Sequence, residues 1–173
     1  MKTTVKNLRL GAALLVLLGI NALLLSCNNA GESTTTTEAS AFVEVDLPWL
    51  NAYLKTKNAL VASNPTDAAT FAKQIAENLS DTANALARAV KAEALKVTAT
   101  NDLKLQREYF QALSRHAHAL AKSGASQGVE LYWQYCPMAA NGEGAHWLST
   151  SESIRNPYFG NKMLKCGSVK EAL

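Results

Sequence analysis

The sequence predicts a mostly helical protein: an antiparallel bundle of about three long helices, closed by an aromatic, loop-rich C-terminal lobe. Two observations predict it. Apolar residues recur every three or four positions over most of residues 47–120, which is the period of an amphipathic helix. After Gly128 this period stops, and half of the aromatic residues fall between positions 132 and 159. We therefore expect a single domain at residues 46–173, with residues 129–173 as its lobe.

The first helix is marked by four apolar residues on one face, and a proline is tolerated in its first turn. The four residues are Leu47, Leu50, Leu54 and Val61. Asn64 and Pro65 then predict a break and a fresh start, with Asn64 as the cap and Pro65 at the first helical position.

One long second helix is expected from the stripe that follows. Its members are spaced by three or four positions, and Thr82 is the only polar one: Phe71, Ile75, Leu79, Thr82, Leu86 and Val90.

A polar interruption at 98–101 separates the third helix, for which Thr100 or Asn101 is the expected cap. Its stripe ends near Gly124 and comprises Leu103, Phe110, Leu113, Ala117 and Leu120. The many alanines of these helices permit close approach of their axes.

The lobe begins with an alternating segment, which favours a short half-buried strand, with a helical turn as the alternative. Val129, Leu131, Trp133 and Tyr135 would share one face of it. Turns are expected at residues 141–144 and 156–157, and a short helix is expected to start at residues 149–152.

The N-terminus is typical of an exported protein. A basic start precedes an apolar run at residues 10–20, which is too short for a comfortable membrane span. The run Leu24-Leu25-Ser26-Cys27 resembles a bacterial lipoprotein signal, which implies cleavage before Cys27 and lipidation of that residue. An ordinary signal peptide or an anchor helix is the alternative. We expect a signal peptide at residues 1–26, a flexible tether at 27–45, and a periplasm-facing lipoprotein anchored in a membrane of the cell envelope.

The charge balance gives no reason to expect a nucleic-acid partner. Lys2, Lys6 and Arg9 account for the whole excess of 17 basic over 14 acidic residues, and all three lie in the predicted signal peptide. The mature chain is therefore close to neutral.

Both methionines outside the signal peptide lie within three residues of a cysteine. Cys136 precedes Met138 by two positions, and Met163 precedes Cys166 by three. Thiolate and thioether sulfur together favour soft ions, Cu(I) above all. The two half-sites would meet if the segment between the cysteines folds back on itself.

Three neighbours of these sulfurs are auxiliary candidates: Trp133 and Trp147 as faces over a bound cation, and His146 as a nitrogen ligand. A Cys136–Cys166 disulfide is the alternative, because the exported chain lies in an oxidising compartment. His116 and His118 are two positions apart on a helix and therefore cannot bind one ion together.

The sequence contains no motif of a catalytic nucleophile, haem site, zinc knuckle or phosphate loop. We therefore expect no enzymatic activity and name no catalytic residue.

Three joined runs in the lobe resemble one bacterial family. They are Leu131-Tyr132-Trp133-Gln134-Tyr135-Cys136-Pro137-Met138-Ala139, Gly144-Ala145-His146-Trp147-Leu148-Ser149 and the run from Ile154 to Gly167. The third-helix segment Gln106-Arg107-Glu108-Tyr109-Phe110 is similar to it as well. The family is the periplasmic domain of unknown function thirty-three forty-seven, whose members occur alone or appended to the adaptors of heavy-metal efflux pumps.

The resemblance implies a copper- or silver-handling context, with an efflux-pump adaptor as partner and Cu(I) as the bound ion. Cys136, Met138, Met163 and Cys166 match the family's motif positions. Cys136-Pro137-Met138 is also similar to the Tyr-x-Cys-Pro-Met-His segment of such adaptors. The chain departs from that segment with Gln134 in place of the tyrosine and Ala139 in place of the histidine.

Overall fold

The computed structural model describes residues 45–79 and 83–173. The predicted signal peptide, Cys27 and almost all of the predicted tether lie outside these residues, as does Thr82. All of the described residues belong to one compact unit, Ala41–Leu173.

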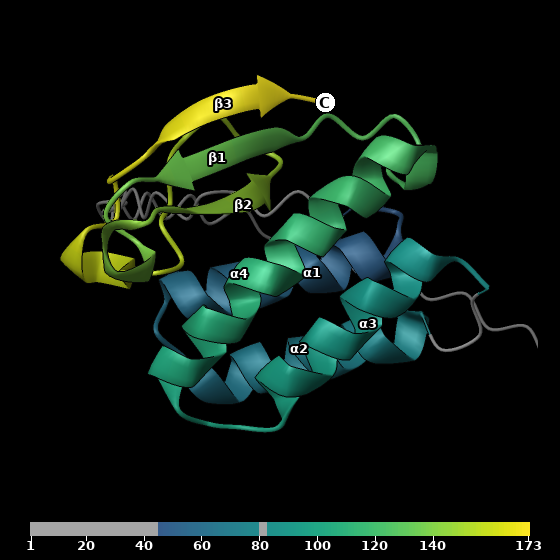
Figure 1. Ribbon diagram of the computed structural model, residues 1–173, viewed down its shortest axis with the longest axis horizontal. Helices are drawn as coiled ribbons and strands as arrows, with labels where there is room; N and C mark the ends of the chain where they lie inside the picture. Colours follow the sequence, from purple (N-terminus) through teal and green to yellow (C-terminus); the bar gives the residue numbers. More distant parts are fainter. Residues whose placement is uncertain (1–44, 80–82) are drawn as a thin grey trace, which may run out of the picture. The chain divides into compact units, whose positions relative to one another are not determined.

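Within residues 45–79 and 83–173, the fold consists of four α-helices and a small sheet, so the predicted bundle of three long helices is wrong (Figure 1). Each helix packs against the next helix along the chain, and the connections between them are short, as expected for antiparallel neighbours. The helices are α1 (Pro48–Val61), α2 (Pro65–Asn78), α3 (Ala85–Thr98) and α4 (Leu103–Leu120). The sheet consists of β1 (Tyr132–Cys136), β2 (Ala145–Ser149) and β3 (Ser168–Ala172).

The predicted long second helix is in fact two helices, α2 and α3. Leu79 is the C-terminal cap of α2, and Asn84 caps α3 by accepting the N–H groups of Leu86 at 2.8 Å and Ala87 at 3.3 Å. Leu79 and Val90 are buried nonetheless. The apolar residues of α2 and α3 therefore both face the core. Their spacing happens to stay at three or four positions on each side of the break, so the sequence pattern does not reveal it.

The other helix boundaries follow local chemistry. Pro48 stands in the first turn of α1, and the Asn64 side chain accepts the N–H of Asp67 at 3.1 Å, which confirms both predictions. For α4 the expected cap is wrong. Asp102 caps this helix, accepting N–H groups from Lys104 at 2.8 Å and Leu105 at 3.1 Å. Thr100 instead accepts the N–H of Asp102 through its hydroxyl, at 3.0 Å.

The predicted strand is confirmed over the residues of β1, but the opposite face is the more deeply buried. Gln134 and Cys136 are fully buried, whereas Trp133 and Tyr135 are partly exposed. Burial of Gln134 is possible because its Nε2 donates to the carbonyls of Ser151 at 2.7 Å and Glu152 at 3.1 Å.

No helix starts at residues 149–152, contrary to the prediction. The segment is an irregular bend after β2, and its carbonyl groups are the acceptors of the Gln134 amide. The turns expected at 141–144 and 156–157 are confirmed. Gly144 has a φ of +84°, and a Cβ atom there would overlap the Tyr135 ring.

The sheet is antiparallel with β1 in the centre, in the order β2-β1-β3. It packs through β2 on α4 and α1 (Figure 1). One apolar core runs from the helices into the sheet. Within residues 45–79 and 83–173, no helix is both long and apolar enough to cross a membrane.

The corrected cap of α4 can be tested directly. Asp102→Ala should lower the free energy of unfolding by about 1 kcal/mol, because two N–H groups of the first turn lose their acceptor. Asn101→Ala is the matched control and should cost less than about 0.5 kcal/mol, since Asn101 is exposed and outside the helix. Urea unfolding followed by circular dichroism measures both. Equal losses would contradict the assignment of the cap.

Candidate thiol site

The two cysteines of the lobe meet at one end of the sheet. Their sulfur atoms are 3.2 Å apart, and both are free thiols. Cys136 ends β1, and Cys166 lies two residues before β3 begins. Because Tyr135 pairs with Ser168 across the two strands, the strand register brings the cysteines together. The fold-back that the sequence analysis required is therefore present.

Asn156 holds the loop that presents Cys166. Its Nδ2 donates to the Cys166 carbonyl at 2.9 Å, and its Oδ1 accepts the N–H of Tyr158 at 2.8 Å. Its own backbone N–H donates to the Leu164 carbonyl at 2.9 Å. Asn156 is fully buried, so these bonds are protected from water. The sequence predicted only a turn at this position.

The thiols differ in exposure. Cys136 is fully buried, whereas Cys166 is partly exposed. The contact with the Cys136 thiol raises the pKa of Cys166, because that hydrogen bond and partial burial favour the neutral form. Any ligand that needs a thiolate here must therefore displace a firmly held proton.

The two methionines stand differently toward the thiols. Met163 shares a turn with Cys166, whose N–H donates to the Met163 carbonyl at 3.0 Å. Met138 is 55% exposed and lines a cavity that neither cysteine lines. Their roles as ligands stay predictions. Among the described residues, no group of three or more His, Cys, Asp or Glu side chains could hold a metal ion.

The auxiliary candidates lie on both faces of the sheet. Trp147 is fully buried beside Gly167, where an added Cβ would lie 3.1 Å from the indole. Trp147 is therefore near the backbone that follows Cys166. Trp133 and His146 stack on each other on the face of the sheet opposite Cys136, with ring centroids 4.9 Å apart. In this conformation Trp133 and His146 do not face the thiols.

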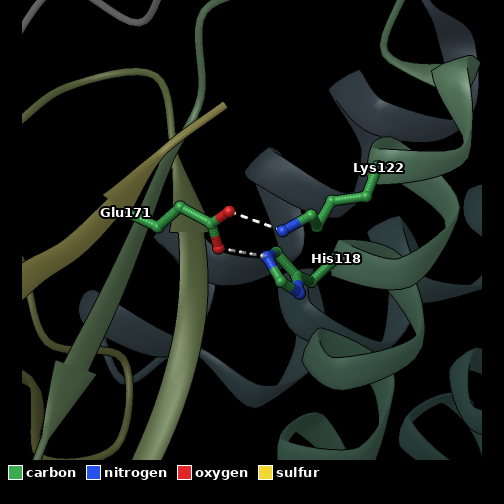
Figure 2. Close-up of polar contacts among 3 residues, drawn as sticks. All are labelled: His118, Lys122 and Glu171. Carbon is green, nitrogen blue, oxygen red and sulfur yellow. Dashed lines mark hydrogen bonds and ion pairs between the residues drawn. The ribbon is translucent and has the colours of Figure 1, made fainter.

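His118 of α4 extends this stack, with its ring centroid 4.1 Å from that of Trp133. Its Nε2 is also 3.1 Å from a carboxylate oxygen of Glu171 on β3. The other oxygen of Glu171 is bonded to Lys122, one helical turn after His118 (Figure 2). Figure 2 shows the Glu171 side chain reaching from the strand to both residues of the helix. This ion-pair cluster fastens β3, the strand that follows Cys166, to α4.

Sequence reasoning missed the cluster. The spacing of His118 and Lys122, four positions apart on a helix, was the only signal, and Glu171 is too distant in sequence to be paired with them.

Three pKa values in and beside the cluster are lowered, those of His118, His146 and Glu171. Burial lowers the pKa of His118, against the opposing effect of Glu171. Burial and then the charge of His118 lower the pKa of His146. The bond from Lys122, followed by His118, lowers the pKa of Glu171.

Folding stability should therefore decrease on acidification. Between pH 7 and 5 the unfolded chain binds protons at His118 and His146 more readily than the folded chain does, which stabilises the unfolded state. Below about pH 4.5 the Glu171 contribution is lost as well, since its folded pKa is lowered. His118→Gln should flatten the slope between pH 7 and 5, measured by urea unfolding at several pH values. His116→Gln is the matched control on the same helix. An unchanged slope in His118→Gln would contradict the prediction.

A family model described as "Protein of unknown function (DUF3347)" matches residues 49–128. The match begins in α1 and ends at Gly128, so it contains all of α2, α3 and α4 but stops before β1. Both cysteines and both methionines of the lobe lie beyond it. No curated protein and no solved structure matches the chain.

Proposed function

Because the chain belongs to the DUF3347 family, whose description names no activity, we propose a function from the thiol pair and the predicted lipoprotein signal. The protein is a membrane-anchored lipoprotein of the cell envelope that binds Cu(I) or Ag(I) and hands it over in heavy-metal efflux or homeostasis. A pump adaptor is the partner that the sequence resemblance suggests. The single observation that supports the metal role is the 3.2 Å separation of the Cys136 and Cys166 sulfurs.

The donor set suits a soft monovalent ion. Two thiols that already touch need only small side-chain rotations to converge on one ion, and Cu(I) accepts few, soft ligands. Met163 lies in the same turn as Cys166 and is the thioether that the sequence predicts as a ligand beside it. Zn(II) would need a fuller set of four ligands, which two thiolates do not supply.

Differential exposure of the thiols suits transfer. Cys136 is buried, so an ion bound to it is shielded from water, while the partly exposed Cys166 can be reached from outside. An incoming ion would meet Cys166 first, and an acceptor would take it from the same side.

A disulfide-stapled scaffold module of an envelope assembly is the second candidate, favoured by the same contact between thiols. Oxidation would form the Cys136–Cys166 bond, release two protons and pass two electrons to an oxidant of the envelope. The bond would stabilise the lobe by about 3 to 4 kcal/mol on the chain-entropy model. Oxidised sulfur cannot act as a thiolate ligand, so the two functions exclude each other in one molecule at one time.

Anaerobic titration of the reduced protein with Cu(I) against a competing chelator tests the metal role. We expect one ion per chain, with sulfur neighbours in X-ray absorption. Cys166→Ser should weaken affinity at least about a hundredfold, because a thiolate is lost. Met138→Leu should change it less than about threefold, since Met138 faces the separate cavity. Affinity should rise at least about tenfold per pH unit near neutrality, because the Cys166 proton is displaced. A shell of nitrogen or oxygen neighbours, or absence of binding, would contradict the proposal.

Mass spectrometry of the full chain, isolated under thiol-blocking conditions, separates the two candidates and tests the anchor. For a metal carrier we expect both Cys136 and Cys166 to carry the blocking reagent, and the N-terminal peptide to begin at a lipidated Cys27. A Cys136–Cys166 link in the protein as isolated would favour the scaffold.

An unmodified Cys27, together with unchanged membrane fractionation of Cys27→Ala, would refute the lipid anchor.

A further inference from the structure

A cavity of about 720 Å³ lies beside α4, away from the thiols. Three segments line it: the first half of α4, the turn between β1 and β2, and residues 158–159. Its volume falls within the usual range for small-molecule sites. Its lining includes Lys104, Arg107, Glu108, Met138, Tyr158 and Phe159.

Arg107 brings a fixed positive charge to the cavity wall. Its Nε donates to the Pro157 carbonyl at 2.8 Å, and its Nη2 donates to the Leu60 carbonyl and the Ser63 hydroxyl, each at 3.0 Å. These contacts fix the guanidinium and leave Nη1 without a hydrogen-bond partner in the described part of the chain. No carboxylate of residues 45–79 and 83–173 forms an ion pair with Arg107.

Burial acts on this uncompensated charge, because it lowers the pKa of Arg107 with no opposing carboxylate. A half-buried guanidinium without a counterion is stabilised when an anion binds to it. Lys104 lines the same wall one turn earlier on α4 and adds a second positive charge.

The remaining walls combine polar side chains with apolar surface from Met138, Tyr158 and Phe159. Met138 is 55% exposed, the highest value among the large hydrophobic residues that the structure describes as exposed. Its thioether can adapt to different apolar shapes. Tyr158 and Phe159 add aromatic surface to the lining. An exposed apolar side chain within a concave site is covered when an apolar ligand binds there.

We propose that this cavity binds a small amphipathic carboxylate, with its charged group at Arg107 and Lys104 and its apolar body against Met138 and Phe159. Neither cysteine lines the cavity, and Met138 is the one residue that it shares with the predicted metal ligands. Glu108 and Glu143 also line the cavity, and both residues are exposed. Water and salt screen their repulsion more than they screen the attraction of the half-buried Arg107.

NMR titration of the folded protein with octanoate tests the proposal. The probes are octanoate, 1-octanol, which keeps the chain without the charge, and acetate, which keeps the charge without the chain. Octanoate should saturate the shifts of the Met138 methyl group and the Arg107 Nε–H together, with a dissociation constant on the order of millimolar for a ligand of this size. Octanol and acetate should each bind at least about tenfold more weakly. Equal binding of octanol, or absence of saturable shifts, would overturn the site.

Three variants of exposed residues make the test independent of Arg107, whose removal would also take three structural contacts. Lys104→Gln should weaken octanoate binding about threefold, and Glu108→Gln should tighten it about threefold, because they remove opposite charges from one wall. Lys165→Gln, an exposed lysine outside the cavity, should change nothing. Shifts of the same sign in Lys104→Gln and Glu108→Gln, or an equal effect of Lys165→Gln, would show that octanoate binds by non-specific contact.

Discussion

The Tyr53 hydroxyl joins α1, α4 and the sheet at one buried point, and the arrangement of the lobe depends on it. It lies 2.8 Å from the Ser114 hydroxyl and accepts the N–H of Leu148 at 3.0 Å. Leu148 belongs to β2, an edge strand of the sheet that the structure describes, and its buried N–H is bonded to Tyr53 and not to another strand. A buried N–H without an acceptor would lower the stability of the fold. The Tyr53 hydroxyl supplies that acceptor, so an edge strand can lie buried against the helices. Burial raises the pKa of Tyr53 and keeps its hydroxyl protonated.

The sequence predicts a helix boundary correctly where one or two local residues determine it. It fails to predict a boundary where two consecutive helices continue the same apolar pattern. Asn64 and Pro65 fixed the start of α2 because a cap and a proline act within four residues. The break before α3 was hidden, because Leu79 and Val90 face one core from two helices in matching phase. The buried face of β1 was also beyond sequence reasoning. Gln134 is acceptable inside only because carbonyls of a distant bend accept its amide, a contact that no local pattern reveals.

For the candidate site, the pairing of sulfurs was within reach of the sequence and the placement of their companions was not. Cys136 and Cys166 meet because β1 and β3 pair. β3 is largely exposed and has no alternation of apolar and polar residues, so the sequence did not predict it as a strand. Met138 is two residues from Cys136, but the turn after β1 carries it to the cavity beside α4. His146 is opposite Tyr135 in the sheet, so strand alternation directs it away from the thiols.

The helices and the sheet form one energetic unit, although the family match ends between them. The ring centroid of Phe110 lies 5.4 Å from that of Tyr53 and 6.0 Å from that of Tyr158 in the lobe. The burial of Phe110 therefore depends on residues from both sides of Gly128. Without β2, the Tyr53 hydroxyl would lose the Leu148 N–H and keep only its contact with Ser114. Residues 49–128 alone would therefore expose apolar surface on α4 and leave a polar group inside the bundle short of one bond. A substitution in the lobe that destabilises β2 or β3 should consequently also affect the packing of α4. This helix contributes His118 to the ion-pair cluster with Glu171 and also lines one wall of the cavity.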